Sequence, residues 1–344
     1  STGAYGITKA GSGTLTLSGA NTYSGSTTLT AGSILIGNAG SGSVGSITNS
    51  SVGTGTLIFN GGTISSDSSV ARTINNPITY TADVTFGDGT NNGALTFAAA
   101  EALGAADRTL TVTTTGGVTL SGIISSTGAY GITKAGSGTL TLSGTNTYTG
   151  VTTINAGTLS VGSIGNGGVA GNLGQATNTA SNLVLGGGTL KYTGSTATSD
   201  RAFTITAGTT GTIDVPTGVT LTLAGATGTT TTGALTKTNS GTLNLSGVNT
   251  YTGTTTISAG TLAITGSGSL NSGSYAGSIV DNATFIYSSS ATQTLSGVIS
   301  GTGALTKDTD TSSVLTLSNT NTYTGVTTIN AGTISVGTIG NGGA

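Results

Sequence analysis

Short runs in which aliphatic residues alternate with Thr or Ser recur along the whole chain and predict β-strands. Residues 14–36 contain three of them, TLTL, TTLTA and SILI. Gly and Asn separate the runs, and these residues suit tight turns because they adopt positive φ at little steric cost. A period of two that is broken by turn residues is typical of consecutive short strands. The sequence therefore predicts an all-β fold.

Two phrases recur in the same order four times. The first, TGAYGITKAGSGTLTLSG, occupies residues 2–19 and returns unchanged at 127–144. The second, TNTYTGVTTINAGTLSVG, occupies 145–162 and returns with one change at 320–337. With the diverged forms, the copies lie near residues 2–37, 127–168, 232–266 and 302–343. A periodic chain is usually a stack of equivalent units, so we interpret residues 1–344 as one continuous segment.

The spacing of the copies favours a solenoid over a string of separate domains. Tyr23, Tyr148, Tyr251 and Tyr323 mark the copies, and the steps between them are 125, 103 and 72 residues. Unequal steps suit a solenoid in which each copy forms one or two coils and the coils between copies vary in number. A lone coil buries too little apolar surface to offset the entropy lost on ordering it. Stacked coils support one another, so the sequence predicts a single continuous rod.

The composition excludes several classes of function. Only 5% of the 344 residues are charged, the net charge is −2, 62 residues are Gly, and Cys and His are absent. Nucleic-acid binding needs clustered Lys and Arg, so no nucleic-acid partner is expected. No apolar stretch approaches the roughly 20 residues that span a bilayer, so this segment is not expected to insert into a membrane. We expect no cofactor, no metal site and no catalytic residues.

The two phrases together, GSGTLTLSGTNTYTGVTTINAGTLSVG and its copies, resemble the passenger-associated transport repeat of bacterial autotransporter passengers. The phrases LVLGGGTLKYTG and QTLSGVISGTGALTK, which lie between the copies, resemble the intervening sequence of the same proteins. The resemblance implies a right-handed parallel β-helix that is exported through the outer membrane of a Gram-negative-type bacterium. It also implies an extracellular or cell-surface location, with repeats that help the passenger cross the membrane and fold outside. The signal and the membrane barrel of that family are not among these residues.

The repeated Asn-Thr-Tyr phrase supplies the candidate site residues. They are Asn21, Tyr23, Asn146, Tyr148, Asn249, Tyr251, Asn321 and Tyr323. The tyrosines could form an exposed aromatic ladder that contacts a glycan or a protein partner. Packing of rings and stacking of amides between coils explains the same pattern, and we favour this second interpretation.

Charged side chains give few further candidates. Lys9, Lys134, Lys237 and Lys307 occupy equivalent positions in the four copies, and we expect them to be solvated at corners or strand edges. Asp308 and Asp310 beside Lys307 could form a weak calcium loop, although a solvated corner is the better explanation because the ligands are few.

These observations favour a non-catalytic extracellular structural protein. Such a rod could act as the stalk of an adhesin or assemble head to tail into a fibre or sheath. Low net charge weakens self-repulsion and so permits such association. The alternatives are a glycan-binding adhesin module that recognises a surface glycan or host-cell ligand and, with less support, a β-helical enzyme that acts on polysaccharides.

Overall fold

The computed structural model describes residues 4–309 and 311–337. The chain divides into two compact units, unit 1 of Ser1–Gly162 with Gly168–Ala176 and unit 2 of Ser163–Gly167 with Thr177–Ala344. Residues 2 and 3 of the first repeat copy and residues 310 and 338–343 of the fourth lie outside the described residues. That the units form one continuous rod stays a prediction.

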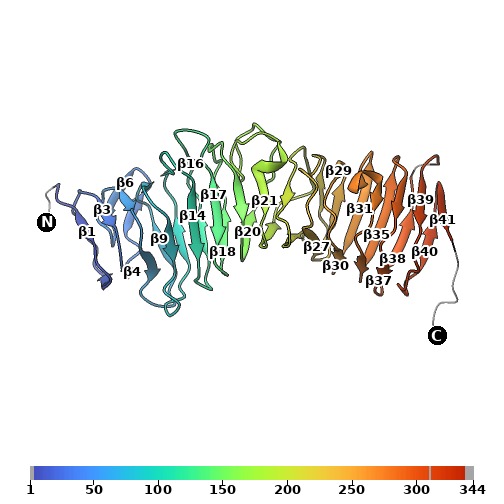
Figure 1. Ribbon diagram of the computed structural model, residues 1–344. Coiled ribbons are helices and arrows are strands. Elements are labelled where there is room, and N and C mark those ends of the chain that lie inside the picture. Colours follow the sequence, from blue (N-terminus) through green and yellow to red (C-terminus); the bar gives the residue numbers. More distant parts are fainter. Residues whose placement is uncertain (1–3, 310, 338–344) are drawn as a thin grey trace. The chain divides into compact units, whose positions relative to one another are not determined.

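Three parallel sheets build unit 1 (Figure 1). The first sheet consists of β1 (Ile7–Lys9), β3 (Thr27–Leu29), β7 (Leu57–Phe59), β10 (Ile78–Tyr80), β13 (Glu101–Ala102) and β16 (Ile124–Ser125). The second consists of β2 (Thr14–Leu17), β4 (Ser33–Ile36), β8 (Thr63–Ser66), β11 (Val84–Phe86), β14 (Arg108–Val112), β17 (Ile132–Ala135) and β19 (Thr152–Ile154). The third consists of β9 (Arg72–Ile74), β12 (Leu95–Phe97), β15 (Val118–Leu120), β18 (Thr139–Leu142) and β20 (Thr158–Val161). An antiparallel hairpin of β5 (Ser41–Ser43) and β6 (Ser46–Asn49) is inserted after β4.

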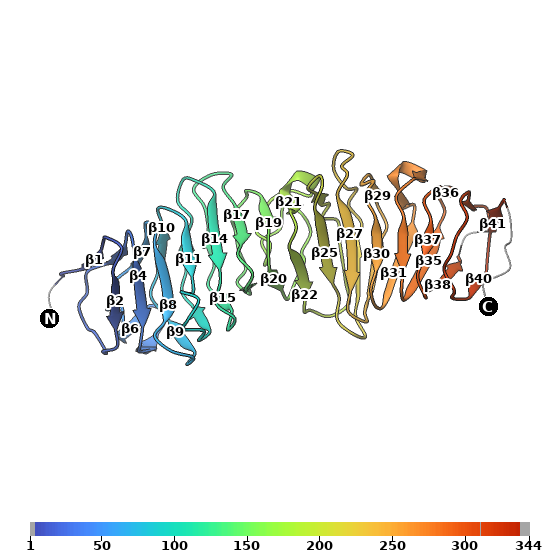
Figure 2. The same cartoon turned by 60° about the horizontal axis from the view of Figure 1, so that its bottom comes forward.

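Unit 2 repeats this arrangement (Figure 2). One sheet contains β22 (Thr189–Tyr192), β25 (Thr210–Asp214), β27 (Ala234–Thr238), β30 (Thr255–Ile257), β34 (Ile279–Asp281) and β37 (Ile299–Ser300). The next contains β23 (Ala197–Ser199), β26 (Thr220–Leu223), β28 (Thr242–Leu245), β31 (Thr261–Gly266), β35 (Thr284–Ser289), β38 (Ala304–Lys307) and β40 (Thr327–Ile329). A third contains β33 (Ser274–Tyr275), β36 (Gln293–Leu295), β39 (Val314–Leu317) and β41 (Thr333–Val336). The pairs β21 (Leu183–Leu185) with β24 (Thr204–Ile205) and β29 (Val248–Asn249) with β32 (Ser269–Leu270) complete the unit.

Helix is limited to two short 3₁₀ turns, η1 (Ala180–Asn182) and η2 (Asn271–Gly273), in the part of the chain that the structure describes. No helix of the described residues has the length and apolarity to cross a bilayer.

The chain winds by visiting the sheets in turn, so consecutive coils pair strand on strand. Ile7 pairs with Thr27, and Thr27 pairs with Leu57, so these coils take 20 and 30 residues. All sheet pairs described are parallel except the inserted hairpin, which confirms the predicted β-solenoid in each unit. Parallel crossovers of this kind are right-handed in nearly all proteins, and right-handed winding is what the family resemblance implies.

The alternation of residues along each strand determines which side chains face the interior of the coil. On β11, Val84 and Phe86 are buried, whereas Thr85 between them faces outward and is half-buried. Inward side chains from successive coils stack, and Phe59 lies with its ring centroid 5.3 Å from that of Tyr80 and 5.8 Å from that of Phe86. Tilted and edge-on ring pairs of this kind add to the stabilisation from burial. The interior of each coil is therefore packed with side chains, and the outer faces carry rows of Thr and Ser.

Candidate functional site

Each repeat copy folds as two stacked pairs of strands. In the second copy, β17 pairs with β19 and β18 pairs with β20. The pairs β1 with β3 and β2 with β4 correspond in the first copy, β27 with β30 and β28 with β31 in the third, and β38 with β40 and β39 with β41 in the fourth. The first phrase thus forms one coil and the second phrase forms the coil stacked on it, with the Asn-Thr-Tyr corner between them.

The four corner tyrosines make the same hydrogen bond. Each hydroxyl pairs with the Thr hydroxyl four residues later, at 2.6 Å for Tyr23 with Thr27, 2.7 Å for Tyr148, 3.0 Å for Tyr251 and 2.6 Å for Tyr323. Tyr23, Tyr148 and Tyr251 are 8%, 0% and 2% exposed, and Tyr323 in the last described coil is half-buried. Burial raises the pKa of Tyr251 well above its ordinary value. Rings placed in this way fill coil corners and offer little aromatic surface to a ligand.

The corner asparagines join neighbouring coils through their side-chain amides. Asn146 Oδ1 accepts from the N–H of Ile124 in the preceding coil at 2.9 Å, and its Nδ2 donates to the carbonyl of Asn172 at 2.8 Å. Asn321 Oδ1 accepts from Ile299 N–H at 2.8 Å in the same manner. An amide carries both donor and acceptor and can satisfy backbone groups on both sides of a corner. Asn21 Nδ2 donates to Ser51 O and Asn249 Nδ2 to Ser269 O, at 2.7 and 3.2 Å.

In the first two copies, backbone hydrogen bonds also join the corner to the segment that follows the repeat. Asn21 forms an antiparallel bridge with Ser50, and Asn146 forms one with Gly171. The N–H of Thr54 then donates to Tyr23 O at 2.9 Å, and the N–H of Gln175 to Tyr148 O at 2.7 Å.

The returning backbone lies close over the tyrosine ring at this corner. A Cβ on Gly174, which has a φ of +72°, would lie 2.6 Å from the ring of Tyr148, and Gly53 is in the same position over Tyr23. The returning segment therefore needs Gly at this point.

The repeat lysines contradict the sequence prediction, because they are buried rather than solvated. Lys9 is 8% exposed, and Lys134, Lys237 and Lys307 are 0% exposed. Lys134 Nζ donates to the carbonyls of Ala135, Gly136 and Ala156 at 2.8, 2.7 and 3.1 Å. Lys9 and Lys237 each donate to the three equivalent carbonyls.

The third carbonyl of this lysine cradle comes from the coil stacked above, so the ammonium joins the two coils of one repeat. Burial lowers the pKa of Lys134 and of Lys237 to about 8. The ammonium satisfies corner carbonyls that would otherwise be buried without a donor, and such groups are costly to leave unpaired. In the fourth copy Lys307 Nζ donates to Asp308 O at 3.3 Å and lies 5.9 Å from the ring centroid of Tyr287.

A buried carboxyl group in unit 1 was not singled out from the sequence. Glu101 is 1% exposed, and its Oε2 accepts from the hydroxyl of Tyr80 at 2.5 Å. Its Oε1 has no hydrogen-bond partner among the described residues. Burial raises the pKa of Glu101 to about 8, although the Tyr80 hydrogen bond acts in the opposite direction. The carboxyl group is therefore mostly protonated at neutral pH.

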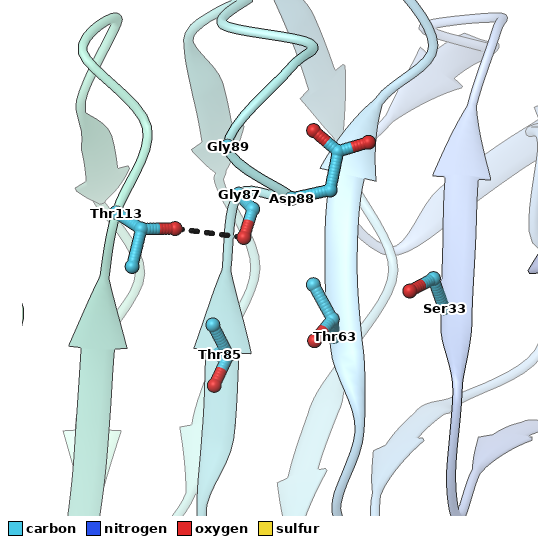
Figure 3. Close-up of a pocket in the computed structure, with 7 residues that line it drawn as sticks. All are labelled: Ser33, Thr63, Thr85, Gly87, Asp88, Gly89 and Thr113. Atoms are coloured by element: carbon cyan, nitrogen blue, oxygen red, sulfur yellow. Dashed lines mark hydrogen bonds between the residues drawn. The ribbon is translucent and has the colours of Figure 1, made fainter. Parts of the chain in front are cut away.

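The outer face of the second sheet of unit 1 carries a shallow groove, about 380 Å³ in volume (Figure 3). Its lining consists of Ser33, Thr63, Thr85, Gly87, Asp88, Gly89 and Thr113. Figure 3 shows the hydroxyl side chains of Ser33, Thr63 and Thr85 on neighbouring strands, with Asp88 on the loop above them. Partial burial raises the pKa of Asp88, but hydrogen bonds from Asn91 and Thr90 hold it below its ordinary value. The groove is thus polar and carries one negative charge.

Carboxylates do not form a cluster in the part of the chain that the structure describes. No group of three His, Cys, Asp or Glu side chains able to hold a metal ion is found there. The proposed calcium loop involves Asp310, which lies outside the described residues. Its neighbour Asp308 uses Oδ1 to accept from Thr309 N–H at 2.7 Å.

The sequence matches the profile of the passenger-associated transport repeat at four places. These are residues 7–36, 132–161, 235–264 and 312–336, each of which lies inside one of the four repeat copies. The chain is also 37% identical over 273 residues to the adhesin BmaC autotransporter of Brucella suis biovar 1 (strain 1330). These matches show that the chain carries the passenger-associated transport repeat and is similar to an autotransporter passenger.

The match to the Brucella protein covers 75% of this chain and 7% of that protein, so the chain spans a small part of its relative's length. No solved structure matches the chain. Autotransporter passengers lie outside the outer membrane of Gram-negative bacteria, which places this passenger sequence at the extracellular cell surface.

Proposed function

We propose that this passenger sequence is a non-catalytic, adhesin-type structural segment that holds a contact surface away from the bacterial cell. The observation that carries the proposal is the joint match to the transport repeat and to an autotransporter named as an adhesin. The packed coil interior supports it, because the repeat residues are used for stacking rather than for a catalytic pocket. The chain has ten acidic residues and no His or Cys, which leaves little chemistry for catalysis.

Attachment of coated beads to cells tests this function. Latex beads that carry the purified chain are applied to epithelial monolayers under flow, with albumin-coated beads as the control. We expect the chain to increase the number of attached beads. A parallel incubation of the chain with a panel of polysaccharides measures the release of reducing ends. Release of sugar by the chain, without attachment of the beads, would show that the enzymatic alternative is correct.

Association between copies is a second candidate, favoured by apolar side chains that are exposed on β40 and β41. Ile329 and Val336 in the last described coil are 55% and 40% exposed, whereas Ile154 and Val161 at the same repeat positions are 0% exposed. Among the described strands, β1, β2, β40 and β41 each have one neighbour in their sheets. A second copy that places β1 and β2 on β40 and β41 would continue the parallel pairing and cover these apolar side chains.

Sedimentation velocity over a range of concentrations tests this association. We expect the chain to form larger species as its concentration rises, and the Ile329→Lys variant to remain a monomer. Val44→Lys, which alters an exposed valine on the hairpin of unit 1, is the matched control and should associate like the parent. A concentration-independent monomer for the parent chain would refute end-to-end association.

A further inference from the structure

The groove on the second sheet of unit 1 is part of a longer row of hydroxyl groups. Paired residues on five adjacent strands form it, namely Thr14, Ser33, Thr63, Thr85 and Thr111. Their neighbours in sequence point inward, as Ile34, Ile64 and Phe86 do, so the row faces outward. Adjacent strands lie about 4.8 Å apart, and the hydroxyls therefore repeat at this spacing across the sheet.

One loop turns the middle of this row into a groove. The chain leaves β11 at Gly87, whose φ is +100°, and Thr113 Oγ1 donates to the carbonyl of Gly87 at 2.7 Å. Asp88 Oδ1 accepts from the N–H groups of Thr90 and Asn91 at 2.9 and 2.7 Å, and Asn91 Nδ2 donates to Asp88 Oδ2 at 2.8 Å. The carboxylate at the rim of the groove is therefore held in place before any ligand arrives, which reduces the entropy lost on binding.

The residues that line the groove select the chemistry of the ligand. The lining has no Lys or Arg and no aromatic or long aliphatic side chain, and Asp88 is its one charged member. Anions are repelled, and apolar ligands meet only small groups such as the methyl groups of Thr63, Thr85 and Thr113. A hydroxyl group both donates and accepts, and a carboxylate accepts from two or more donors. A ligand that carries neutral hydroxyl groups at regular intervals would satisfy the row and the rim together.

We propose that the groove binds an extended, neutral polysaccharide whose successive sugars lie along the hydroxyl row, across the strands. Extended β-linked chains repeat along their length at close to the spacing of adjacent strands, so each sugar can meet a new hydroxyl. The sugar hydroxyls donate to Asp88 at one side and exchange hydrogen bonds with Ser33, Thr63 and Thr85 below. This proposal rests on the adhesin-type function, for which it names the partner.

Isosteric substitution tests the groove without altering the shape of the coil. Thr63→Val and Thr85→Val remove one hydroxyl each and keep a β-branched side chain, which suits a strand. Thr119→Val is the matched control, because Thr96, Thr119 and Thr141 form an equivalent row on the third sheet that no part of this groove touches. The probes are six-sugar oligomers of β-1,4-linked glucose and of β-1,4-linked N-acetylglucosamine, titrated calorimetrically into the purified chain.

The expected result is saturable binding of at least one oligomer by the parent chain. The double variant Thr63→Val with Thr85→Val should weaken that binding at least tenfold, and Asp88→Asn should weaken it severalfold. The control variant should bind like the parent, and far-UV circular dichroism should show the same β-structure for every protein. Equal loss in the control, or unchanged binding in the double variant, would overturn the assignment of the groove.

The bead assay separates this proposal from the function on which it rests. If neither oligomer binds at millimolar concentration while coated beads still attach to cells, the glycan groove is refuted and the adhesin-type function stands. If beads attach through a protein receptor, protease treatment of the cells abolishes attachment and the double variant attaches normally, and this outcome also refutes the groove. If the beads do not attach at all, the adhesin-type function itself fails.

Discussion

The buried carboxyl group of Glu101 makes the stability of unit 1 depend on pH. Burial raises the pKa of Glu101 from its ordinary 4.5 to about 8. Between these values the folded chain holds a proton that the unfolded chain releases, so the free energy of unfolding falls as pH rises from 4.5 to about 8. At about 1.4 kcal/mol per pH unit, the interval corresponds to roughly 5 kcal/mol.

Glu101→Gln should remove this dependence, because the amide keeps the shape of the protonated acid and does not ionise. Urea unfolding followed by far-UV circular dichroism at several pH values from 5 to 8.5 measures the effect. The variant should match the parent within about 1–2 kcal/mol at pH 5, where both side chains are neutral in the folded state. At pH 8.5 it should be more stable than the parent by several kcal/mol, with roughly 5 as the upper limit.

Asp83→Asn is the matched control, since it removes an exposed carboxyl group from the same unit. This variant should lose stability between pH 5 and 8.5 as the parent does. Amide exchange in the strands around Glu101 provides a local readout, and protection there should fall with rising pH in the parent only. A parent and a Glu101→Gln variant with the same slope over this range would refute the reasoning.

Three further substitutions test the repeat, all by urea unfolding. Lys134→Met should lower the free energy of unfolding by about 2–5 kcal/mol, because three corner carbonyls lose their donor. The control Lys191→Met, at an exposed position, should lower it by less than about 0.5 kcal/mol. The parent should also gain stability from pH 8 to about 9.5, since the pKa of Lys134 is lowered to about 8 in the folded state, and Lys134→Met should reduce that gain. Tyr148→Phe should cost about 1–2 kcal/mol by leaving the buried hydroxyl of Thr152 without its partner. Gly174→Ala should lower the free energy of unfolding by about 1–3 kcal/mol or more, because the added Cβ would collide with the ring of Tyr148. An unchanged urea midpoint for Tyr148→Phe or for Gly174→Ala would contradict the corner geometry.

The strands and the stacking could be predicted from the sequence because both depend on local repetition. The three runs between residues 14 and 36 became β2, β3 and β4, and the repeated phrases became stacked coils. The lysine prediction failed although the signal was present. Lys9 follows Ile7 by two residues, as Lys134 follows Ile132, and a period of two places both members of each pair on the inner face. The charge of a lysine favours a solvated position, but its place in the alternation puts it on the inner face.

The groove and Glu101 depend on long-range register, which the local pattern does not determine. Ser33, Thr63 and Thr85 are separated by 30 and 22 residues, and the hairpin of β5 and β6 accounts for the longer interval. Glu101 occurs in a phrase without a second copy, and only its pairing with Ile78 and Ile124 shows that it points inward. Pairing between coils of unequal length cannot be obtained from spacing alone.

The antiparallel bridge between Asn21 and Ser50 lets the segment 38–49 change in length without a change in the geometry of the coils. This segment leaves the coil after β4 and returns to a fixed corner, and its tip around Gly45 is open to solvent. Foreign peptides could therefore be grafted at Gly45 and displayed on the surface without a change in the pairing of β3 with β7. The same freedom lets natural selection lengthen, shorten or exchange the segment while the scaffold beneath it stays constant.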